Sequence, residues 1–231
     1  MSARRAVLVG FALGLAACGG RGGEAETETP SAAVPVGAAP NTLTAEEQAA
    51  GWRLLFDGTT LSGWRGYGRQ DLPETWAVMD GAITHPTEGG DMDGGDILTV
   101  EEFTDFELVF DFKVGPSGNS GVFYRVREAE GKGLWQVAPE YQVLDDPAYP
   151  ASDDWTPETH RTGENYDLQA ADQRVVHPAG EWNTGRILVQ GHHVEHWLNG
   201  AMTATYDLYS PEWEALVAKS KFAEEEFYAR A

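Results

Sequence analysis

Asn119-Ser-Gly-Val-Phe-Tyr-Arg125 and Glu140-Tyr-Gln-Val-Leu-Asp145 are the two stretches that decide the fold. Apolar and polar residues alternate in each, which is the period of a β-strand with one buried face. If the two strands are neighbours, Arg125, Glu140 and Gln142 meet on the face opposite the apolar one. An acid, a cation and an amide on one sheet face predict a site for a polar, hydroxyl-rich ligand.

The remaining chain predicts further strands separated by Asx-Gly turns, without alternating helices. The expected strands lie at 52–56, 105–114 and 186–190, and on either side of Asp80-Gly81 and Asn199-Gly200. This pattern indicates an all-β fold, an antiparallel two-sheet sandwich of the jelly-roll kind. One outer face would hold ligand, under loops expected at 127–139 and 146–181.

Two helices are expected at the ends of this domain. Thr44-Ala-Glu-Glu47 is a capping-box pattern for a short N-terminal helix, which Gly51 ends. Ser210 followed by Pro211 is typical of a helix start, and apolar spacing after it predicts a helix over 211–230.

The chain begins with the features of a targeting segment. Arg4 and Arg5 precede an apolar run, which ends in Leu15-Ala-Ala-Cys18. This resembles the bacterial lipobox, so we expect a lipoprotein signal peptide over 1–17, lipidation of Cys18, a flexible linker over 18–41 and one domain over 42–231. The expected location is the cell envelope, lipid-anchored to the outer membrane on its periplasmic or surface side. The alternative is an ordinary signal peptide with an incidental cysteine.

The charge excludes some partners. The net charge is −21, and it becomes 14 − 37 = −23 when 1–17 is removed. A chain this acidic without a basic patch is a poor nucleic-acid binder. It also argues against adsorption to anionic lipid, so membrane contact would be through the lipid anchor only. The alternative reading of the acidity is simple solubility.

Several motifs in order and spacing resemble the bacterial 3-keto-disaccharide hydrolase domain family, which has a concanavalin A-like lectin/glucanase jelly roll. They are Gly51-Trp-Arg-Leu-Leu-Phe-Asp-Gly58, Leu61-Ser-Gly-Trp64, Trp76-Ala-Val-Met-Asp-Gly81, the two opening stretches, Gly180-Glu-Trp-Asn183 and Val194-Glu-His-Trp-Leu-Asn-Gly200. Family members usually continue into two more strands after a segment like Ser220-Lys-Phe222. The expectation is therefore a truncated C-terminus or a helix in place of those strands.

The resemblance implies cleavage of a 3-keto-glycoside or 3-keto-disaccharide. A base takes the proton from C2, an electrophile stabilises the enolate, and the bond at C1 breaks by elimination with later addition of water, or by formal hydrolysis. Glu140 is the leading base or metal ligand. Arg125 would bind the keto oxygen, or form a surface ion pair with Glu140. His196 would act as acid, base or metal ligand, although its parity also fits a core histidine.

Other residues are candidates for binding a carbohydrate. They are Gln142, Asn119, Tyr166, Trp182, Trp197 and Asp145. Each has a structural alternative, such as a turn role for Asn119 or loop orientation for Asp145. No cofactor is certain, and a divalent metal ion is left open. The alternatives to an enzyme are a carbohydrate-binding lipoprotein without catalysis and an inactive fragment.

Overall fold

The computed structural model describes residues 2–6, 39–85, 95–150, 158–226 and 228–229. Its largest element is a seven-stranded antiparallel sheet in the order β11-β10-β9-β6-β1-β4-β3. These strands are β1 (Ser2–Ala6), β3 (Ala77–Met79), β4 (Ala82–Thr84), β6 (Phe106–Lys113), β9 (Asn183–Gln190), β10 (His193–Leu198) and β11 (Ala201–Asp207).

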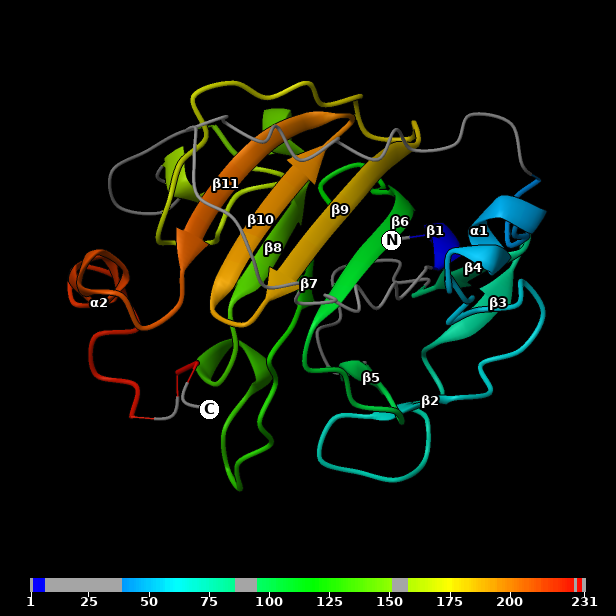
Figure 1. The fold of residues 1–231 in the computed structure, drawn as a ribbon, viewed down its shortest axis with the longest axis horizontal. Coiled ribbons are helices and arrows are strands. Elements are labelled where there is room, and N and C mark those ends of the chain that lie inside the picture. The colour runs from blue at the N-terminus through cyan, green and yellow to red at the C-terminus, as the bar shows by residue number, and fades with distance from the viewer. Residues whose placement is uncertain (1, 7–38, 86–94, 151–157, 227, 230–231) are drawn as a thin grey trace, which may run out of the picture.

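Two smaller antiparallel sheets accompany it. The strands β7 (Asn119–Phe123) and β8 (Glu140–Leu144) pair with each other, as do β2 (Trp64–Gly66) and β5 (Ile97–Thr99). In Figure 1, β7 and β8 lie behind the large sheet, α1 (Ala45–Ala49) lies beside β3 and β4, and α2 (Pro211–Val217) lies beyond β11. Short 3₁₀ turns at Leu134–Gln136, Asp146–Ala148 and Glu158–His160 punctuate the two predicted loops.

The core lies between β8 and the large sheet. Tyr141 and Val143 of β8 are fully buried, as the alternation predicted. The Tyr141 ring meets Phe110 and Phe112 of β6 edge-on, with ring centroids 5.3 and 6.4 Å apart. Burial of these rings is a large apolar contribution to stability. The expected all-β sandwich is confirmed.

The Asx-Gly turns form as predicted. Asp80 and Gly81 have φ of 51° and 70°, and Asn199 and Gly200 have φ of 47° and 83°. These left-handed values are those of a type I′ hairpin turn, which Asx and Gly adopt at little cost. The capping box of α1 also forms, with Thr44 and Glu47 bonded to each other's backbone N–H.

Two predicted elements are wrong. Residues 52–56 form no strand, although Phe56 is buried. The helix expected over 211–230 ends at Val217, after which the chain turns back toward β8. The reason is competition for its backbone N–H groups: Lys221 N donates to Asp167 Oδ2 (2.7 Å), and Ala229 N donates to the Val137 carbonyl (3.0 Å). We call residues 220–229 the tail.

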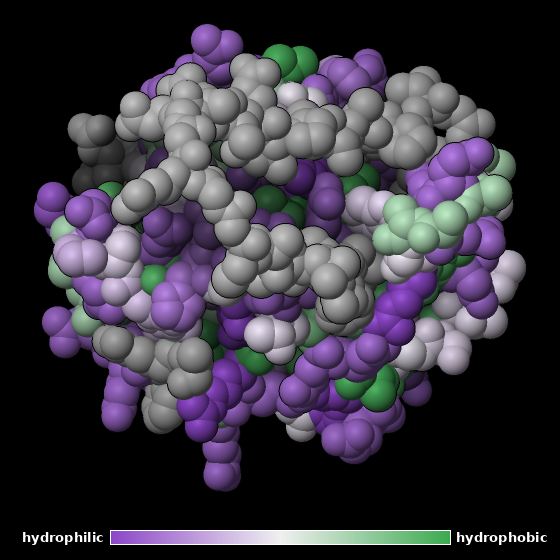
Figure 2. Space-filling model, in the orientation of Figure 1, coloured by the Kyte–Doolittle hydropathy of each residue, from purple (hydrophilic) through white to green (hydrophobic). Residues whose placement is uncertain are grey.

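The beginning of the chain is described only at β1, which pairs with β4 and β6. Cys18 and the expected linker as far as residue 38 lie outside the described residues, so the leader, its cleavage and lipidation stay predictions. No helix within the described ranges has the length and apolarity that crossing a membrane requires. Outside the grey atoms, most of the surface seen in Figure 2 is hydrophilic.

Candidate active site

The pairing of β7 with β8 builds the centre of the site. Gly121 lies opposite Gln142, and Phe123 lies opposite Glu140, so these four share one sheet face. The Glu140 side chain extends diagonally over Gly121: a Cβ placed on Gly121 would lie 2.0 Å from Glu140 Oε1. Glycine at 121 is therefore a condition for the position of the Glu140 carboxylate.

The Glu140 carboxyl group has an unusual affinity for its proton. Burial raises its pKa to about 8, while the nearby Lys221 ammonium opposes this shift. Within the described part of the chain, no group donates a hydrogen bond to the carboxylate, and the residue keeps some contact with solvent. A carboxyl group with a pKa near neutrality and no internal donor is suited to proton transfer with a substrate.

Tyr166 and Lys221 form the wall beside Glu140. Tyr166 is placed by its backbone N–H, which donates to the Glu140 carbonyl (3.1 Å). Lys221 Nζ donates to the Tyr166 hydroxyl (3.0 Å) and lies 4.1 Å from the centroid of that ring, with the Trp135 ring 5.1 Å away. Partial desolvation lowers the pKa of Lys221, and burial raises that of Tyr166 to about 12. A lysine ammonium and a tyrosine hydroxyl can both donate hydrogen bonds to a ligand.

Asp167 joins this wall to the loop before it. One of its carboxylate oxygens meets His160 Nε2 at 2.5 Å, and the other accepts the Lys221 backbone N–H. The His160 ring in turn stacks on Tyr166, with centroids 4.2 Å apart. Hydrogen bonds from His160 and Lys221 lower the pKa of Asp167 against the effect of its burial. The Asp167 carboxylate therefore holds both the His160 ring, which stacks on Tyr166, and the tail that carries Lys221.

Gln142 and Asn119 meet on the same face as Glu140. Gln142 is only 2% exposed, and its Nε2 donates to Asn119 Oδ1 (3.3 Å), while Asn119 is exposed. The expected meeting of Gln142 with Glu140 on one sheet face is thus found, and Asn119 joins them there. Gln142 lies beneath the surface and orients Asn119, which is the group that solvent or a ligand can reach.

The structure does not bring Arg125 to this face, contrary to expectation. The strand β7 ends at Phe123, and Arg125 has a φ of 55°, which breaks the alternation that the prediction assumed. Its guanidinium instead bonds to the Gly191 carbonyl and lies 3.9 Å from Asp105 Oδ1.

His196 occupies the core side of β10, as its parity allowed. It is fully buried, its Nε2 lies 2.6 Å from the Tyr124 hydroxyl, and that hydroxyl also bonds to Tyr206. Burial lowers the pKa of His196 to about 3, so the ring is neutral at all ordinary pH. These contacts favour the structural alternative for His196.

Three other predicted residues lie at different places. Trp197 alternates with the buried His196 and so lies on the outer face of the large sheet, where its ring is 5.1 Å from the Arg186 guanidinium. Trp182 lies beneath Lys113 at the end of β6, also at 5.1 Å. Asp145 accepts the Ser117 backbone N–H (2.8 Å), which is the loop-orienting alternative. Their substrate-binding roles stay predictions.

Sequence reasoning missed Lys221, Asp167 and His160 as site residues. Lys221 was hidden because the tail was predicted to be a helix, whereas its turn back to β8 depends on tertiary contacts. No local pattern marks Asp167, apart from its place directly after Tyr166. As to metals, the described residues contain no group of three or more His, Cys, Asp or Glu side chains arranged to hold an ion.

Comparison with known proteins agrees with this fold. Residues 51–228 match the family described as the 3-keto-alpha-glucoside-1,2-lyase-like domain. A 3-keto-disaccharide hydrolase from Bacteroides thetaiotaomicron is 35% identical over 192 residues, which is 78% of this chain and 66% of that protein. The crystal structure of a proposed glycosyl hydrolase from Parabacteroides distasonis superposes with a TM-score of 0.75 at 33% identity, covering 83% of this chain and 88% of that one.

The chain spans about two thirds of the length of the curated relative, and nearly all of the solved one. The match to the family covers both opening stretches, the loop that carries Tyr166 and the tail that carries Lys221. This chain is therefore a member of the 3-keto-alpha-glucoside-1,2-lyase-like domain family.

Proposed function

We propose that this protein cleaves the glycosidic bond of 3-keto-glycosides or 3-keto-disaccharides with Glu140 as the proton-transfer group. The observation that carries the proposal is the environment of the Glu140 carboxyl group. Its pKa is about 8, and it lies beside two donors, the Lys221 ammonium and the Tyr166 hydroxyl. A base paired with donors for a developing negative charge is what removal of a proton next to a carbonyl requires.

The reaction follows from these groups. Ionised Glu140 takes the proton from C2, and the electron pair moves onto the keto oxygen, where Lys221 and Tyr166 stabilise the negative charge. The enolate then collapses: the keto group re-forms, a double bond forms between C1 and C2, and the bond from C1 to the glycosidic oxygen breaks. That oxygen takes the proton that Glu140 holds. Addition of water across the resulting double bond completes a net hydrolysis.

The names of the relatives support a carbohydrate substrate, and the 3-keto group is carried over from the Bacteroides protein's name as part of the proposal. Inverting or retaining glycosidases use two carboxylates that flank the bond. The Asp96 carboxyl group lies near enough to raise the pKa of Glu140. The two donors beside Glu140, Lys221 and Tyr166, nevertheless fit enolate chemistry better. We also propose that the protein acts at the cell envelope, anchored through Cys18.

The test is release of sugar from 3-keto-trehalose and from a 3-keto-glucoside by the full chain, with and without EDTA. Glu140→Gln keeps the shape of the side chain and removes its proton chemistry, so turnover should fall by about 10³-fold or more while sugar binding remains. Glu224→Gln, an exposed carboxylate on the same tail, is the matched control and should leave turnover unchanged.

Three outcomes are informative. Unchanged turnover in Glu140→Gln would remove Glu140 from the mechanism. A folded wild-type chain that binds these sugars without releasing product would overturn the enzyme proposal in favour of a carbohydrate-binding module. Loss of activity in EDTA, restored by a divalent ion, would add a metal to the reaction.

A further inference from the structure

A hollow lies at the other end of β8, away from Glu140. It has a volume of about 460 Å³, and its polar wall consists of Asp146, Glu158, Arg161 and Arg174. Two prolines and a valine, Pro147, Pro150 and Val176, form its apolar wall. Nothing in the chemistry proposed for Glu140 uses these residues.

The loop that supplies Tyr166 to the active site also builds this hollow. It runs along β8, with Tyr166 N bonded to the Glu140 carbonyl at one end and the Thr162 hydroxyl bonded to the Leu144 carbonyl (2.9 Å) at the other. Thr162 N also donates to Asp146 Oδ1 (3.1 Å). On β8, Glu140 and Leu144 are four residues apart, which is about 13 Å at ~3.3 Å per residue of extended strand. The hollow is thus a separate place on the same strand.

Arg174 is the group in this hollow whose contacts call for a ligand. Its guanidinium lies among three carboxylates, 3.5 Å from Glu164, 3.6 Å from Glu158 and 3.8 Å from Asp146. These distances exceed those of a hydrogen bond. The Nη1 atom is buried, and no acceptor in the described residues bonds to it. A buried donor without an acceptor destabilises the fold, and a bound acceptor would remove that cost.

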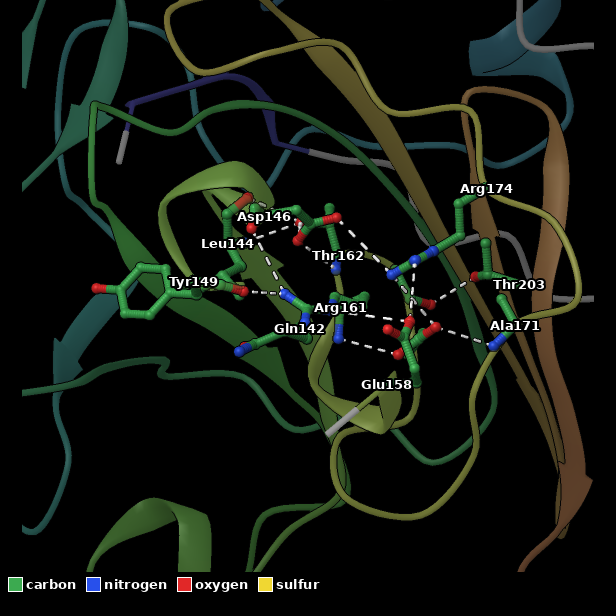
Figure 3. Close-up of polar contacts among 12 residues, drawn as sticks. Gln142, Leu144, Asp146, Tyr149, Glu158, Arg161, Thr162, Ala171, Arg174 and Thr203 are labelled. Atoms are coloured by element: carbon green, nitrogen blue, oxygen red, sulfur yellow. Dashed lines mark hydrogen bonds and ion pairs between the residues drawn. The ribbon is translucent and has the colours of Figure 1, made fainter. Parts of the chain in front are cut away.

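The neighbouring groups are fixed and therefore preorganised. Arg161 is 4% exposed, and its guanidinium donates to the Tyr149 carbonyl. Glu164 is 1% exposed, and its two oxygens accept the backbone N–H groups of Arg161 and Ala171, each at 2.9 Å. In Figure 3 the Arg161 guanidinium points toward the Tyr149 carbonyl, and the Arg174 side chain points toward Asp146.

The charges of the lining indicate the class of ligand. Two guanidinium groups face the carboxylates of Asp146 and Glu158, with the buried Glu164 carboxyl group behind Arg174, so the wall offers donors and acceptors side by side. An anion would meet two carboxylates, and a cation would meet two guanidinium groups. A neutral ligand with several hydroxyl groups satisfies both, because each hydroxyl donates and accepts. The prolines and Val176 suit the C–H face of a sugar ring.

We propose that this hollow is a second binding site for a neutral sugar, with Arg174 as its main hydrogen-bond donor. The site is independent of the proposed reaction at Glu140, because binding here requires no proton transfer. It would hold a second molecule of sugar, or a remote part of a glycan whose reacting end lies at Glu140.

Backbone amide NMR of the ¹⁵N-labelled full chain tests this proposal. The amides of Thr162 and Ala171 report on the hollow, and those of Tyr166 and Lys221 report on the active site. Titration with methyl α-glucoside and with trehalose should shift the first pair in a saturable manner. Glucuronate, the charged comparison, should bind the hollow more weakly.

Arg174→Met keeps most of the side-chain volume and removes the donors, so binding in the hollow should weaken about tenfold or more. Arg53→Met, at a surface ion pair elsewhere, should change nothing. Glu158→Gln, whose side chain is 65% exposed, provides a second variant that leaves the buried framework intact and should also weaken binding.

The result that supports the proposal is a shift of Thr162 and Ala171 that is lost in Arg174→Met and kept in Glu140→Gln. No shift of these two amides at high sugar concentration would overturn it. Binding in Arg174→Met and Glu158→Gln that is as tight as in the unaltered protein would also overturn it. So would tighter binding of glucuronate than of the neutral sugars. A chain inactive on 3-keto-glycosides that still shows the shift would overturn only the proposed reaction.

Discussion

Replacement of Lys221 with methionine should move the pH dependence of turnover to higher pH. Glu140 acts as a base only when it is ionised, so kcat/KM should rise with pH through a pKa of about 8 in the unaltered protein. The Lys221 ammonium favours the ionised carboxylate and therefore lowers this pKa. Its removal leaves burial unopposed, and the pKa of Glu140 should increase.

The size of this shift follows from the position of Lys221. A positive charge within a few ångströms changes a carboxyl pKa by roughly 1–3 units, and we expect the low end because Lys221 keeps contact with solvent. At pH 7, roughly one tenth of Glu140 is ionised when its pKa is 8, and roughly one hundredth when it is 9. Ionisation alone should thus cost about tenfold in kcat/KM at pH 7.

The assay is the initial rate of sugar release from a 3-keto-glucoside between pH 6 and about 10. The plateau of kcat/KM at high pH should also fall, because Lys221 no longer stabilises the enolate. The pH range over which kcat/KM rises to this plateau, the limb of the profile, does not depend on the height of the plateau. Lys219→Met, an exposed lysine two residues earlier, is the control and should keep the original limb. A limb that stays in place in Lys221→Met would refute the pairing of Lys221 with Glu140.

Two further substitutions probe the site and the fold. Gly121→Ala should lower kcat by about 10²-fold or more, because its Cβ would displace the Glu140 carboxylate; Gly115→Ala, which meets nothing within 4 Å, should leave kcat unchanged. Equal activity in both would show that the position of Glu140 is not limiting. Ser210→Ala removes the cap that accepts Trp213 N (3.1 Å) and should lower the free energy of unfolding by about 1 kcal/mol in urea titrations; no change would mean that α2 does not depend on its cap.

Much of the fold could be predicted because its signals are local. The turns at Asp80-Gly81 and Asn199-Gly200 need left-handed φ values, which few residues adopt cheaply, and the apolar alternation over β6 allows one register. The tail could not be predicted in this way. Its apolar residues have helical spacing, but Asp167 and Val137 take its backbone N–H groups, and both lie far away in the sequence.

The site was predictable in part for the same reason. Glu140, Gln142 and Asn119 share a face because strand alternation and antiparallel pairing place them there. Arg125 would have joined them only if β7 had continued past Phe123, and its left-handed backbone conformation is not marked in the sequence. Lys221 arrives from a segment about eighty residues after Glu140 in the chain, so its place depends on the whole fold.

The close approach of Glu140 to Gly121 also constrains how related chains can vary. A side chain at the position of Gly121 and a glutamate in this orientation at the position of Glu140 exclude each other, because the Cβ would lie 2.0 Å from Oε1. The two positions are therefore sterically coupled, and replacing the glycine would force the Glu140 carboxylate out of its present position even where the glutamate is kept. Whether a related chain can place a glutamate in this way therefore depends on the presence of glycine at the position of Gly121, a residue without a reactive side chain.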